Sequence, residues 1–578
     1  MTGRPTPRSR SVSAARLPPP RPDRPWVPRL AGAVTYLLGA LDIVSGFRYT
    51  LRERLRTLTD IGPGVVGDAA SAATVVTGIL IILIAHGLRR RKARAWRATL
   101  ALLGSSVILN GARLHWGTLL VALVLLVVLV LERREFRAMG DPRTRWRSLT
   151  VFVALFVTST LIGILVLLLN RRNIVGGWPG LWPVVEQVWS GFIGMDGGLV
   201  LRRDRLADVI SALLLGLGLM TGVTSLYLLL RAPEPRPELT DVDEARLREL
   251  LRTSPDSLGY FNLRRDKSVV WSDSRKAAVA YRVVGGVMLA SGDPIGDPEA
   301  WPGAMATFLR EAADHAWTPA VLGCSERAGL TWSRLAGLSA MELGDEAVLD
   351  VAEFSLEGRP MRNVRQMVGR VHRAGYETRV CRVADLSPDE RTAVLQDAAS
   401  WRRSETERGF SMALGRTVDP MDPQAVLVTA SQDGRVRGLL QLVPWGDDGM
   451  SLDLMRRDSA AEPGINELLI SAAMEAAPAL GVQRVSLNFA VFRAVLERGE
   501  RLGAGPFLRA WRTILIFASR WFQIESLYRF NAKFQPEWQP RYLLYPGPAD
   551  LPRVGVAALE AEAFLVWPSF RRLREAHL

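Results

Sequence analysis

The chain has 578 residues, a formal net charge of +15 and a sequence pI near 10.5. This length exceeds what one hydrophobic core supports, so it predicts several domains, and the basic balance favours anionic partners such as nucleic acid or acidic lipid. Two distant cysteines and five scattered histidines exclude a disulfide framework and argue against a structural metal.

Apolar residues concentrate before residue 232, after a basic, proline-rich tail (1–26) that we expect to be disordered and cytoplasmic. Their runs approach the roughly 20 residues that a spanning helix needs, so they predict an all-α membrane domain over 27–231 with about six transmembrane helices. A buried soluble helical bundle is the alternative. The expected spans are Val27–Phe47, Val65–Leu88, Trp96–Arg113, Thr118–Leu131, Leu149–Leu169 and Leu206–Leu230.

The distribution of cations predicts the orientation of these spans. Basic clusters at Arg89–Arg94 and Arg133–Arg147 follow the second and fourth spans, which places both loops inside and everything after Arg231 in the cytoplasm. The loop at Arg48–Arg56 is also basic and would face outward. Tryptophans among the glycines of Gly176–Gly198 indicate an interfacial or re-entrant segment, with a substrate-lining role as the alternative.

After a proline-rich linker (232–240), two lobes are expected, over 241–385 and 386–578, with the same order of strands, helix and strand. This predicts a duplicated α+β unit, with helices Met361–Ala374 and Pro388–Trp401 bridging the lobes. The first lobe has expected strands Ala277–Val283, Gly286–Ala290 and Pro319–Gly323 around helix Trp301–His315. The second has expected strands Ala425–Ala430, Gly438–Val443, Ser451–Met455 and Arg484–Phe489 around helix Ile465–Ala479.

The segment Glu525–Tyr542 near the end of the second lobe combines aromatic residues, cations and the prolines Pro536 and Pro540. Prolines disfavour a helix there, and the charges disfavour a strand in the core. Interleaved rings and cations suit an RNA 3′ end or a lipid phosphate headgroup, and a packed C-terminal element is the plainer alternative.

Four further segments precede it in order, namely Ser291–Gly296, Met361–Gly375, Gly409–Arg416, and Asp453–Arg457 followed by Gly464–Glu467. Together these segments resemble the phosphatidylglycerol lysyltransferase family, membrane enzymes that move an amino acid from aminoacyl-tRNA onto a lipid. The resemblance implies an N-terminal membrane region and a cytoplasmic, tandem acetyltransferase-like catalytic domain in a bacterial cell membrane. It also implies aminoacyl-tRNA and phosphatidylglycerol as partners, and resistance to cationic peptides through a less anionic membrane. Homo-oligomerisation stays open.

Asp453 and Arg456 lie three residues apart near the expected end of a strand, before a helix whose free N–H groups attract an anion. An ordinary strand-end ion pair is the alternative. Given the resemblance, the expected catalytic residues are Asp453, Arg456 and Lys533. The expected substrate-binding residues are Arg457, Asn466, Glu467, Arg416, Tyr528, Arg529, Asn531, Trp538 and Arg541.

No cofactor or metal is expected for transfer from an activated ester. The loop Arg456–Asn466 has one glycine and a proline, which does not fit the glycine spacing that cradles coenzyme A in acetyltransferases. Arginines at helical spacing are expected to dock tRNA or anionic headgroups, although such a row is often simply a solvated face. These residues are Arg362, Arg365, Arg370 and Arg373.

Two other functions remain open on sequence alone. One is the same chemistry on another acceptor, either a diacylglycerol or a peptidoglycan precursor, and the other is lipid flipping or transport by the membrane domain. Some family members carry a fused lysyl-tRNA synthetase, and we expect none after Leu578. The donor amino acid therefore stays open among lysine, alanine and ornithine.

Overall fold

The computed structural model describes residues 30–37, 81, 84–85, 88, 95–100, 116–133, 142–195, 197–230, 235, 237, 239–402, 409–491 and 524–564. The chain divides into two compact units, Met1–Arg231 and Ala232–Leu578. The basic tail, most of the first three expected spans, the cluster at Arg89–Arg94 and most of the linker lie outside the described residues.

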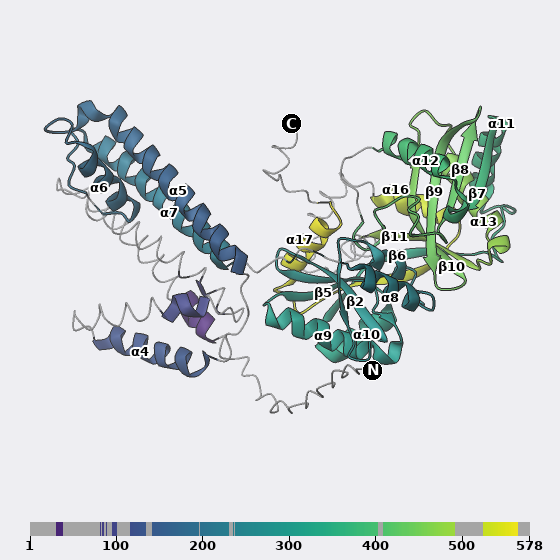
Figure 1. Ribbon diagram of the computed structural model, residues 1–578, viewed down its shortest axis with the longest axis horizontal. Coiled ribbons are helices and arrows are strands. Elements are labelled where there is room, and N and C mark those ends of the chain that lie inside the picture. The colour runs from purple at the N-terminus through teal and green to yellow at the C-terminus, as the bar shows by residue number, and fades with distance from the viewer. Residues whose placement is uncertain are drawn as a thin grey trace, which may run out of the picture. The chain divides into compact units, whose positions relative to one another are not determined.

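In the first unit, helices α5 (Pro142–Leu169) and α7 (Asp204–Leu230) lie side by side, and α6 (Leu181–Phe192) packs against both (Figure 1). Leu149–Leu169 and Leu206–Leu226 are each 21 residues long and apolar enough to cross a membrane, with only 17% of each window buried. Such exposure is untypical of a core helix in a soluble protein. The apolar helix α4 (Trp116–Leu131) has 16 described residues, and six spans remain a prediction.

Small residues bring these helices close together. A Cβ atom on Gly163 of α5 would lie 2.7 Å from Val188 of α6, and one on Gly218 of α7 would lie 2.2 Å from the carbonyl oxygen of Phe192. Ser159 and Thr221 share a hydrogen bond of 3.2 Å between α5 and α7. Close contacts through glycine and hydroxyl residues are typical of helix packing in membranes.

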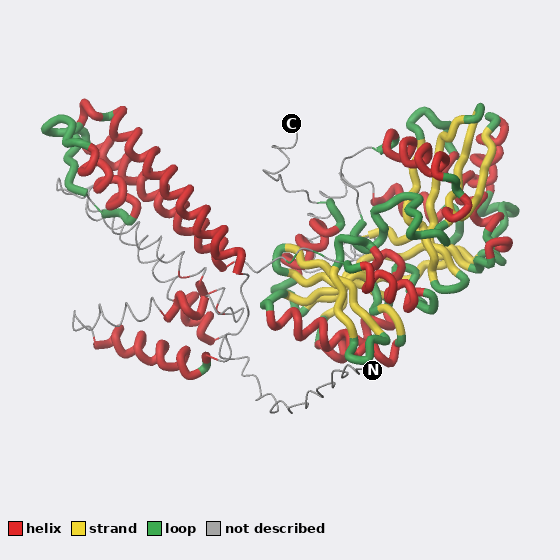
Figure 2. Tube along the Cα trace, in the orientation of Figure 1, coloured by secondary structure: helices red, strands yellow, loops and turns green. Residues whose placement is uncertain are grey.

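The described part of the second unit holds one sheet of 12 strands, in the order β1-β2-β3-β5-β12-β6-β11-β10-β9-β8-β7, with β4 beside β2 (Figure 2). The strands are β1 (Ser268–Trp271), β2 (Ala277–Val284), β3 (Val287–Ser291), β4 (Ile295–Gly296), β5 (Thr318–Cys324), β6 (Ser339–Asp350), β7 (Tyr376–Arg382), β8 (Val426–Gln432), β9 (Arg435–Trp445), β10 (Gly449–Arg457), β11 (Arg484–Val491) and β12 (Glu537–Tyr545). The α-helices are α8 (Asp241–Leu251), α9 (Trp301–Asp314), α10 (Glu326–Ala336), α11 (Arg362–Arg373), α12 (Pro388–Ser400), α13 (Ile465–Ala476), α16 (Ile524–Ala532) and α17 (Leu551–Ala561).

The two halves of this sheet repeat one pattern of pairing. Strands β1, β2, β3 and β5 pair antiparallel, antiparallel and parallel, and β8, β9, β10 and β11 do the same. A helix connects each parallel pair, α9 in the first half and α13 in the second. The predicted duplicated α+β unit is therefore present in the fold.

The halves also exchange a strand. β12, from the end of the chain, pairs with β5 of the first half, whereas β6 pairs with β11 of the second half, and β6 and β12 pair with each other. β7 pairs with β8 and α11 packs on α13, so both belong to the second half although they precede residue 386. Helix α11 therefore does not bridge the lobes as expected.

In the inner strands of the sheet, side chains on both faces are buried, because alternate residues enter different cores. On β2 and β3, Ala278 and Leu289 face a core that runs through both halves, and Val279 and Met288 face a core with α9. Helices α8, α12 and α17 contribute to the shared core, whereas α11 and α13 form a core of the second half. Helix α12 thus joins the halves, as the sequence predicts.

The prediction for the closing segment is wrong. Its first part forms α16 and its second part forms β12, a strand in the middle of the sheet. Pro540 is accommodated opposite Asp345 of β6, and the Arg541 cation is buried against carboxylates. Ion pairing thus allows a strand at this position although the local sequence disfavours one.

Candidate active site

The parallel strands β10 and β11 separate where the sequence places Asp453. They pair over Gly449–Ser451 and Arg484–Ser486, and within the described residues no further pair follows, although both strands continue. β10 shifts its register against β9 around Asp453. Such bulges re-aim side chains and are common next to active sites. We refer to the opening between the two strands as the fork.

The side chain of Asn488 crosses this fork. Asn488 has a left-handed backbone with φ of 69°, a conformation that asparagine tolerates better than most residues. Its Nδ2 donates hydrogen bonds to the carbonyl oxygens of Met412, at 2.8 Å, and Leu452, at 3.1 Å. The loop around Met412 is thereby tied to both strands of the fork.

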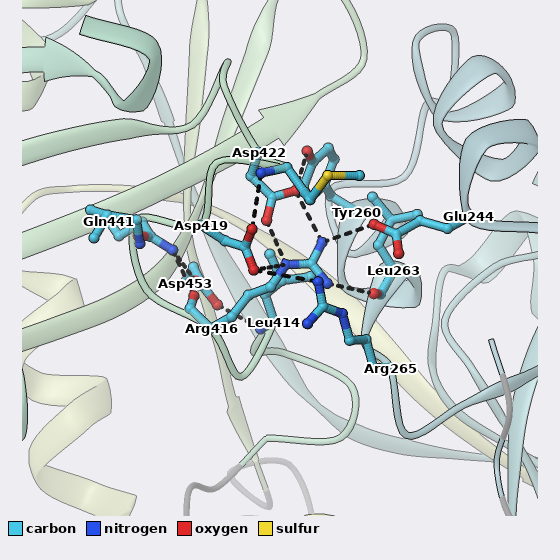
Figure 3. A network of polar contacts seen from close by, with 12 residues as sticks. Glu244, Tyr260, Leu263, Arg265, Leu414, Arg416, Asp419, Asp422, Gln441 and Asp453 are labelled. Atoms are coloured by element: carbon cyan, nitrogen blue, oxygen red, sulfur yellow. Dashed lines mark hydrogen bonds and ion pairs between the residues drawn. The ribbon is translucent and has the colours of Figure 1, made fainter. Parts of the chain in front are cut away.

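The Asp453 carboxylate is half-buried and accepts one hydrogen bond on each oxygen (Figure 3). The Leu414 backbone N–H donates to Oδ1 at 2.6 Å, and Gln441 Nε2 donates to Oδ2 at 2.6 Å. Burial raises the pKa of Asp453 to about 6, although both hydrogen bonds oppose that shift. A carboxyl group with a pKa near the working pH suits general acid–base catalysis.

Beside Asp453, the loop 409–425 is held by a network of charges (Figure 3). Arg416 Nε donates to Asp422 at 2.6 Å, and Arg248 of α8 donates to the other carboxylate oxygen at 2.8 Å. The Tyr260 hydroxyl donates to Asp422 as well, at 2.9 Å. Burial opposes ionisation of Asp422, but the hydrogen bonds from Arg416 and Arg248 hold its pKa below its ordinary value. The structure therefore brings Arg416 close to Asp453 but uses its guanidinium within the protein.

Two buried charges fix the start of the same loop. Glu562, which follows α17, accepts hydrogen bonds from the backbone N–H groups of Phe410, at 2.6 Å, and Ser411, at 2.9 Å. Lys267 is fully buried and its Nζ lies 4.6 Å from the centre of the Phe410 ring. Nζ donates to the Phe261 carbonyl oxygen at 2.9 Å and to Ser291 Oγ at 2.8 Å.

Burial lowers the pKa of Lys267 to about 7, which predicts a specific pH dependence of stability. Between pH 7 and about 10 the unfolded lysine binds a proton that the folded one has lost, so stability rises with pH. Relative to Lys267→Met, the wild type should gain at most about 1.4 kcal/mol of unfolding free energy per pH unit in this window. Urea denaturation of both full-length proteins in detergent tests this. A difference that stays constant with pH would contradict it.

The cationic candidate Lys533 pairs with Glu467 in the first turn of α13, at 2.8 Å. The Lys533 side chain is 37% exposed, whereas the Glu467 side chain is 9% exposed. Glu467 thus places its own negative charge at the helix N-terminus, which is favourable there. The positive end of α13 therefore lies beside the carboxylate of this pair. Nearby, Asn466 Oδ1 and Asn531 Nδ2 are buried and make no hydrogen bond among the described residues.

The alternative of a strand-end ion pair between Asp453 and Arg456 is not formed within the described residues. Arg456 Nη1 donates instead to the Ala398 carbonyl oxygen of α12 at 2.7 Å. Arg457 Nη1 makes a longer contact of 3.4 Å with the Ala461 carbonyl oxygen. The bulge at Asp453 and the spacing of three residues explain why the Asp453 carboxylate and the Arg456 guanidinium bond to different groups.

Arg541 lies in a closed, buried network and not at a free surface. Its guanidinium bonds Asp256 at 2.7 Å and Glu346 at 2.8 Å, and it donates to Ser257 Oγ at 2.6 Å. Ser486, the last residue of β11 that pairs with β10, also donates to Glu346. The network therefore joins the exchanged strands β6 and β12 to the base of the fork. We propose this structural role in place of the expected contact with substrate.

The aromatic and arginine candidates of the closing segment belong to α16 and β12, and the row of arginines belongs to α11. The rings of Tyr528 and Trp538 are 4.9 Å apart, and Arg529 is exposed. On α11, Val364, Val368 and Val371 are buried. The expected docking arginines form the opposite, exposed face, namely Arg362, Arg365, Arg370 and Arg373.

A family model described as phosphatidylglycerol lysyltransferase, C-terminal, matches residues 248–545, more than half of the chain. The chain belongs to the phosphatidylglycerol lysyltransferase family. The match spans the fork and the closing segment of this family member. A second model, described as the transmembrane region of lysyl-tRNA synthetase, matches residues 23–227, which contain α4 to most of α7.

Curated relatives of this family member are described as the lysylphosphatidylglycerol biosynthesis bifunctional protein LysX. The protein of Rhodococcus opacus is 40% identical over 562 residues, covering 94% of this chain and 49% of that one. The protein of Nocardia farcinica is 41% identical over 552 residues, covering 93% of this chain and 48% of that one. The chain thus spans about half the length of these relatives.

The solved structure of L-PGS from Bacillus licheniformis shares the fold of the second unit. It is 21% identical, has a TM-score of 0.50, and the likeness covers 58% of this chain and 99% of that one. The architecture of the second unit is thus one that a solved structure also has.

Several residues of this site were not predicted from the sequence. They are Gln441, Asn488, Asp422, Lys267 and Glu562. Gln441 carried a visible signal, since it is the one polar residue in the run Gly438–Val443. Lys267 and Glu562 carried none, because the side chain of Ser291 and the loop residues Phe410 and Ser411, which they contact, lie far away in sequence.

Proposed function

We propose that this protein is an integral membrane aminoacyltransferase that moves an amino acid from aminoacyl-tRNA to a hydroxyl of phosphatidylglycerol. Membership of the phosphatidylglycerol lysyltransferase family supports this reaction, and the match of residues 23–227 to a transmembrane region supports the membrane location. The observation that carries the proposal is Asp453, a half-buried carboxylate held by two donors in the fork of an acyltransferase-like fold.

In the proposed reaction, Asp453 is the general base. A glycerol hydroxyl of the lipid attacks the carbonyl carbon of the aminoacyl ester, and the Asp453 carboxylate takes the proton of that hydroxyl. The tetrahedral intermediate then breaks its bond to the tRNA ribose oxygen, which takes the proton from Asp453 and leaves as a hydroxyl. A base and strict positioning are needed because a neutral alcohol is a weak nucleophile. Asp453 also suits binding of the substrate ammonium, the second role that its charge supports.

The other candidates act in binding. We assign Arg456 and Lys533 to the phosphates or the developing oxyanion, which requires substrate to displace Lys533 from Glu467. The remaining expected substrate-binding residues are proposed to contact substrate as well. They are Arg457, Asn466, Glu467, Tyr528, Arg529, Asn531 and Trp538.

We propose lysine as the donor amino acid, because the relatives are named for lysylphosphatidylglycerol biosynthesis. A lysyl ester adds two ammonium groups to a headgroup with one negative charge, so it reverses the headgroup charge and weakens attraction of cationic peptides. Expression in a bacterium without aminoacylated lipids, followed by lipid extraction and mass spectrometry, tests this. Lysylphosphatidylglycerol is expected. Alanyl or ornithyl lipid would change the donor, and modified diacylglycerol would change the acceptor.

The proposal places the second unit in the cytoplasm, where aminoacyl-tRNA is found. The basic cluster at Arg133–Arg147 between expected spans motivates this orientation. A reporter fused after Leu578 should therefore be active if it requires the cytosol and inactive if it requires the exterior. The reverse result would exclude transfer from tRNA at this site.

The exposed arginine face of α11 is proposed to dock tRNA by charge. Arg362→Ala and Arg373→Ala should raise the KM for aminoacyl-tRNA a few-fold at low salt, with little effect on kcat, and should converge with wild type as salt rises. Each substitution should also make the salt dependence of binding shallower by about one unit of slope. Arg310→Ala, an exposed arginine of α9, is the matched control. Equal effects of all three would contradict specific docking by α11.

A further inference from the structure

Gln441 is a buried amide whose hydrogen bonds all lead to the active-site loop and Asp453. Its side chain belongs to β9 and the residue is 1% exposed. Oε1 accepts a hydrogen bond from the Val418 backbone N–H at 2.7 Å. Nε2 donates to the Arg416 carbonyl oxygen at 3.1 Å and to Asp453 Oδ2 at 2.6 Å.

These partners allow only one orientation of the amide. The Val418 N–H can only donate, so it requires the oxygen of Gln441, and the Arg416 carbonyl can only accept, so it requires the nitrogen. The second N–H of Gln441 must then point at Asp453. Its direction is thus set by backbone groups that do not take part in the reaction.

The register of the sheet explains why the two side chains meet. Leu452 pairs with Leu442 and Leu454 pairs with Gln441, so the extra residue Asp453 bulges out of β10 opposite β9. A bulged residue leaves the ladder and its side chain is re-aimed. Here it is re-aimed to a fixed donor on the neighbouring strand.

We propose that Gln441 is a positioning residue for the transfer reaction, which fixes the Asp453 carboxylate in the fork and keeps it in its ionised, proton-accepting form. The inference rests on the proposed function of Asp453 as base. A hydrogen bond donated to a carboxylate favours the charged form. Together with the Leu414 N–H, the amide uses one lone pair on each oxygen and leaves the others for substrate.

Other charges also act on Asp453, and among the residues that carry them Gln441 bonds only Arg416, through its backbone carbonyl oxygen. Arg416 favours the ionised carboxylate, and Asp422 opposes it, both from the loop 409–425. Arg248 and Glu244 of α8, with Tyr260, reach this site through Asp422. Arg456, on the same strand, bonds the Ala398 carbonyl. A change in the titration of Asp453 on substitution of Gln441 is therefore attributable to the amide.

The test measures the pH profile of kcat/KM for aminoacyl transfer in the full-length wild type, Gln441→Glu and Gln441→Met. Gln441→Glu keeps the size but puts a second carboxylate beside Asp453, and Gln441→Met removes the donor. We expect the acidic limb, centred near pH 6 in wild type, to move up by about one unit or more in both. Such a shift means roughly fivefold lower activity at pH 6 and much less loss at pH 8.

Gln432→Glu is the matched control, because it introduces the same charge on β8 of the same sheet, where the amide bonds Ala374. Its acidic limb should stay at the wild-type position. Variants of Gln441 that melt like wild type but keep an unmoved limb would overturn the proposal, whether or not their activity falls uniformly. A wild-type protein without tRNA-dependent transfer would instead overturn the proposed function.

Discussion

Asp453→Asn is expected to lower the rate of aminoacyl-lipid formation by on the order of 100- to 10,000-fold, the usual cost of losing a general base. The substitution keeps the size but removes the charge and basicity of the carboxylate. It also places an NH₂ group against one of two donors, Leu414 N–H or Gln441 Nε2, so some loss of stability accompanies it. Single-turnover rates with saturating substrates measure the chemical step.

Asp458→Asn provides the control for this experiment. Asp458 follows the same strand and pairs with Arg437 at 2.7 Å, away from Gln441 and Leu414. We expect near wild-type rates for it. Thermal melting separates misfolded protein from inactive protein, and a folded Asp453→Asn protein with wild-type rate would place the base elsewhere.

Arg541→Met is expected to destabilise the second unit by about 3–5 kcal/mol, because it leaves buried carboxylates without their cation. Asp256 and Glu346 both bond the Arg541 guanidinium, and all three side chains are at most 4% exposed. Glu346 also accepts hydrogen bonds from Ser257 and Ser486, which hold the base of the fork. We therefore expect Arg541→Met to have a lower melting temperature than the wild type. It should also lose activity at a temperature where the wild type is still folded.

Arg379→Met is the matched control for Arg541→Met. Arg379 forms an exposed ion pair with Glu390 on the same unit, and exposed pairs contribute little to stability. We expect no measurable change in its melting temperature. Arg541→Met with wild-type stability but weaker substrate binding would show that Arg541 contacts substrate after all.

Periodicity and turn residues predicted many of the helices and strands of the second unit. The expected strand Ala277–Val283 and helix Trp301–His315 correspond to β2 and α9, and the expected helix at Met361–Ala374 corresponds to α11. These elements have locally encoded patterns, because each buries a face defined by its own sequence. On α11 the valines are buried and the arginines are exposed, and both sets follow helical spacing.

The exchanged strands and the buried charges were not predictable in this way. β12 contains a proline and an arginine, and it becomes a central strand only because Glu346 and Asp256 supply partners from elsewhere in the chain. Likewise, the sequence places Lys533 beside aromatic residues but does not show that Glu467 neutralises it. Long-range pairing, unlike periodicity, leaves no mark at either position alone.

The most direct test of the central proposal is transfer by the purified full-length protein in phosphatidylglycerol vesicles, supplied with radiolabelled lysyl-tRNA. We predict label in the lipid fraction, no label after the tRNA is digested with RNase beforehand, and no transfer from a lysyl thioester of coenzyme A. Transfer from the thioester without tRNA would contradict the proposal. So would the absence of transfer from each of lysyl-, alanyl- and ornithyl-tRNA when these are supplied intact.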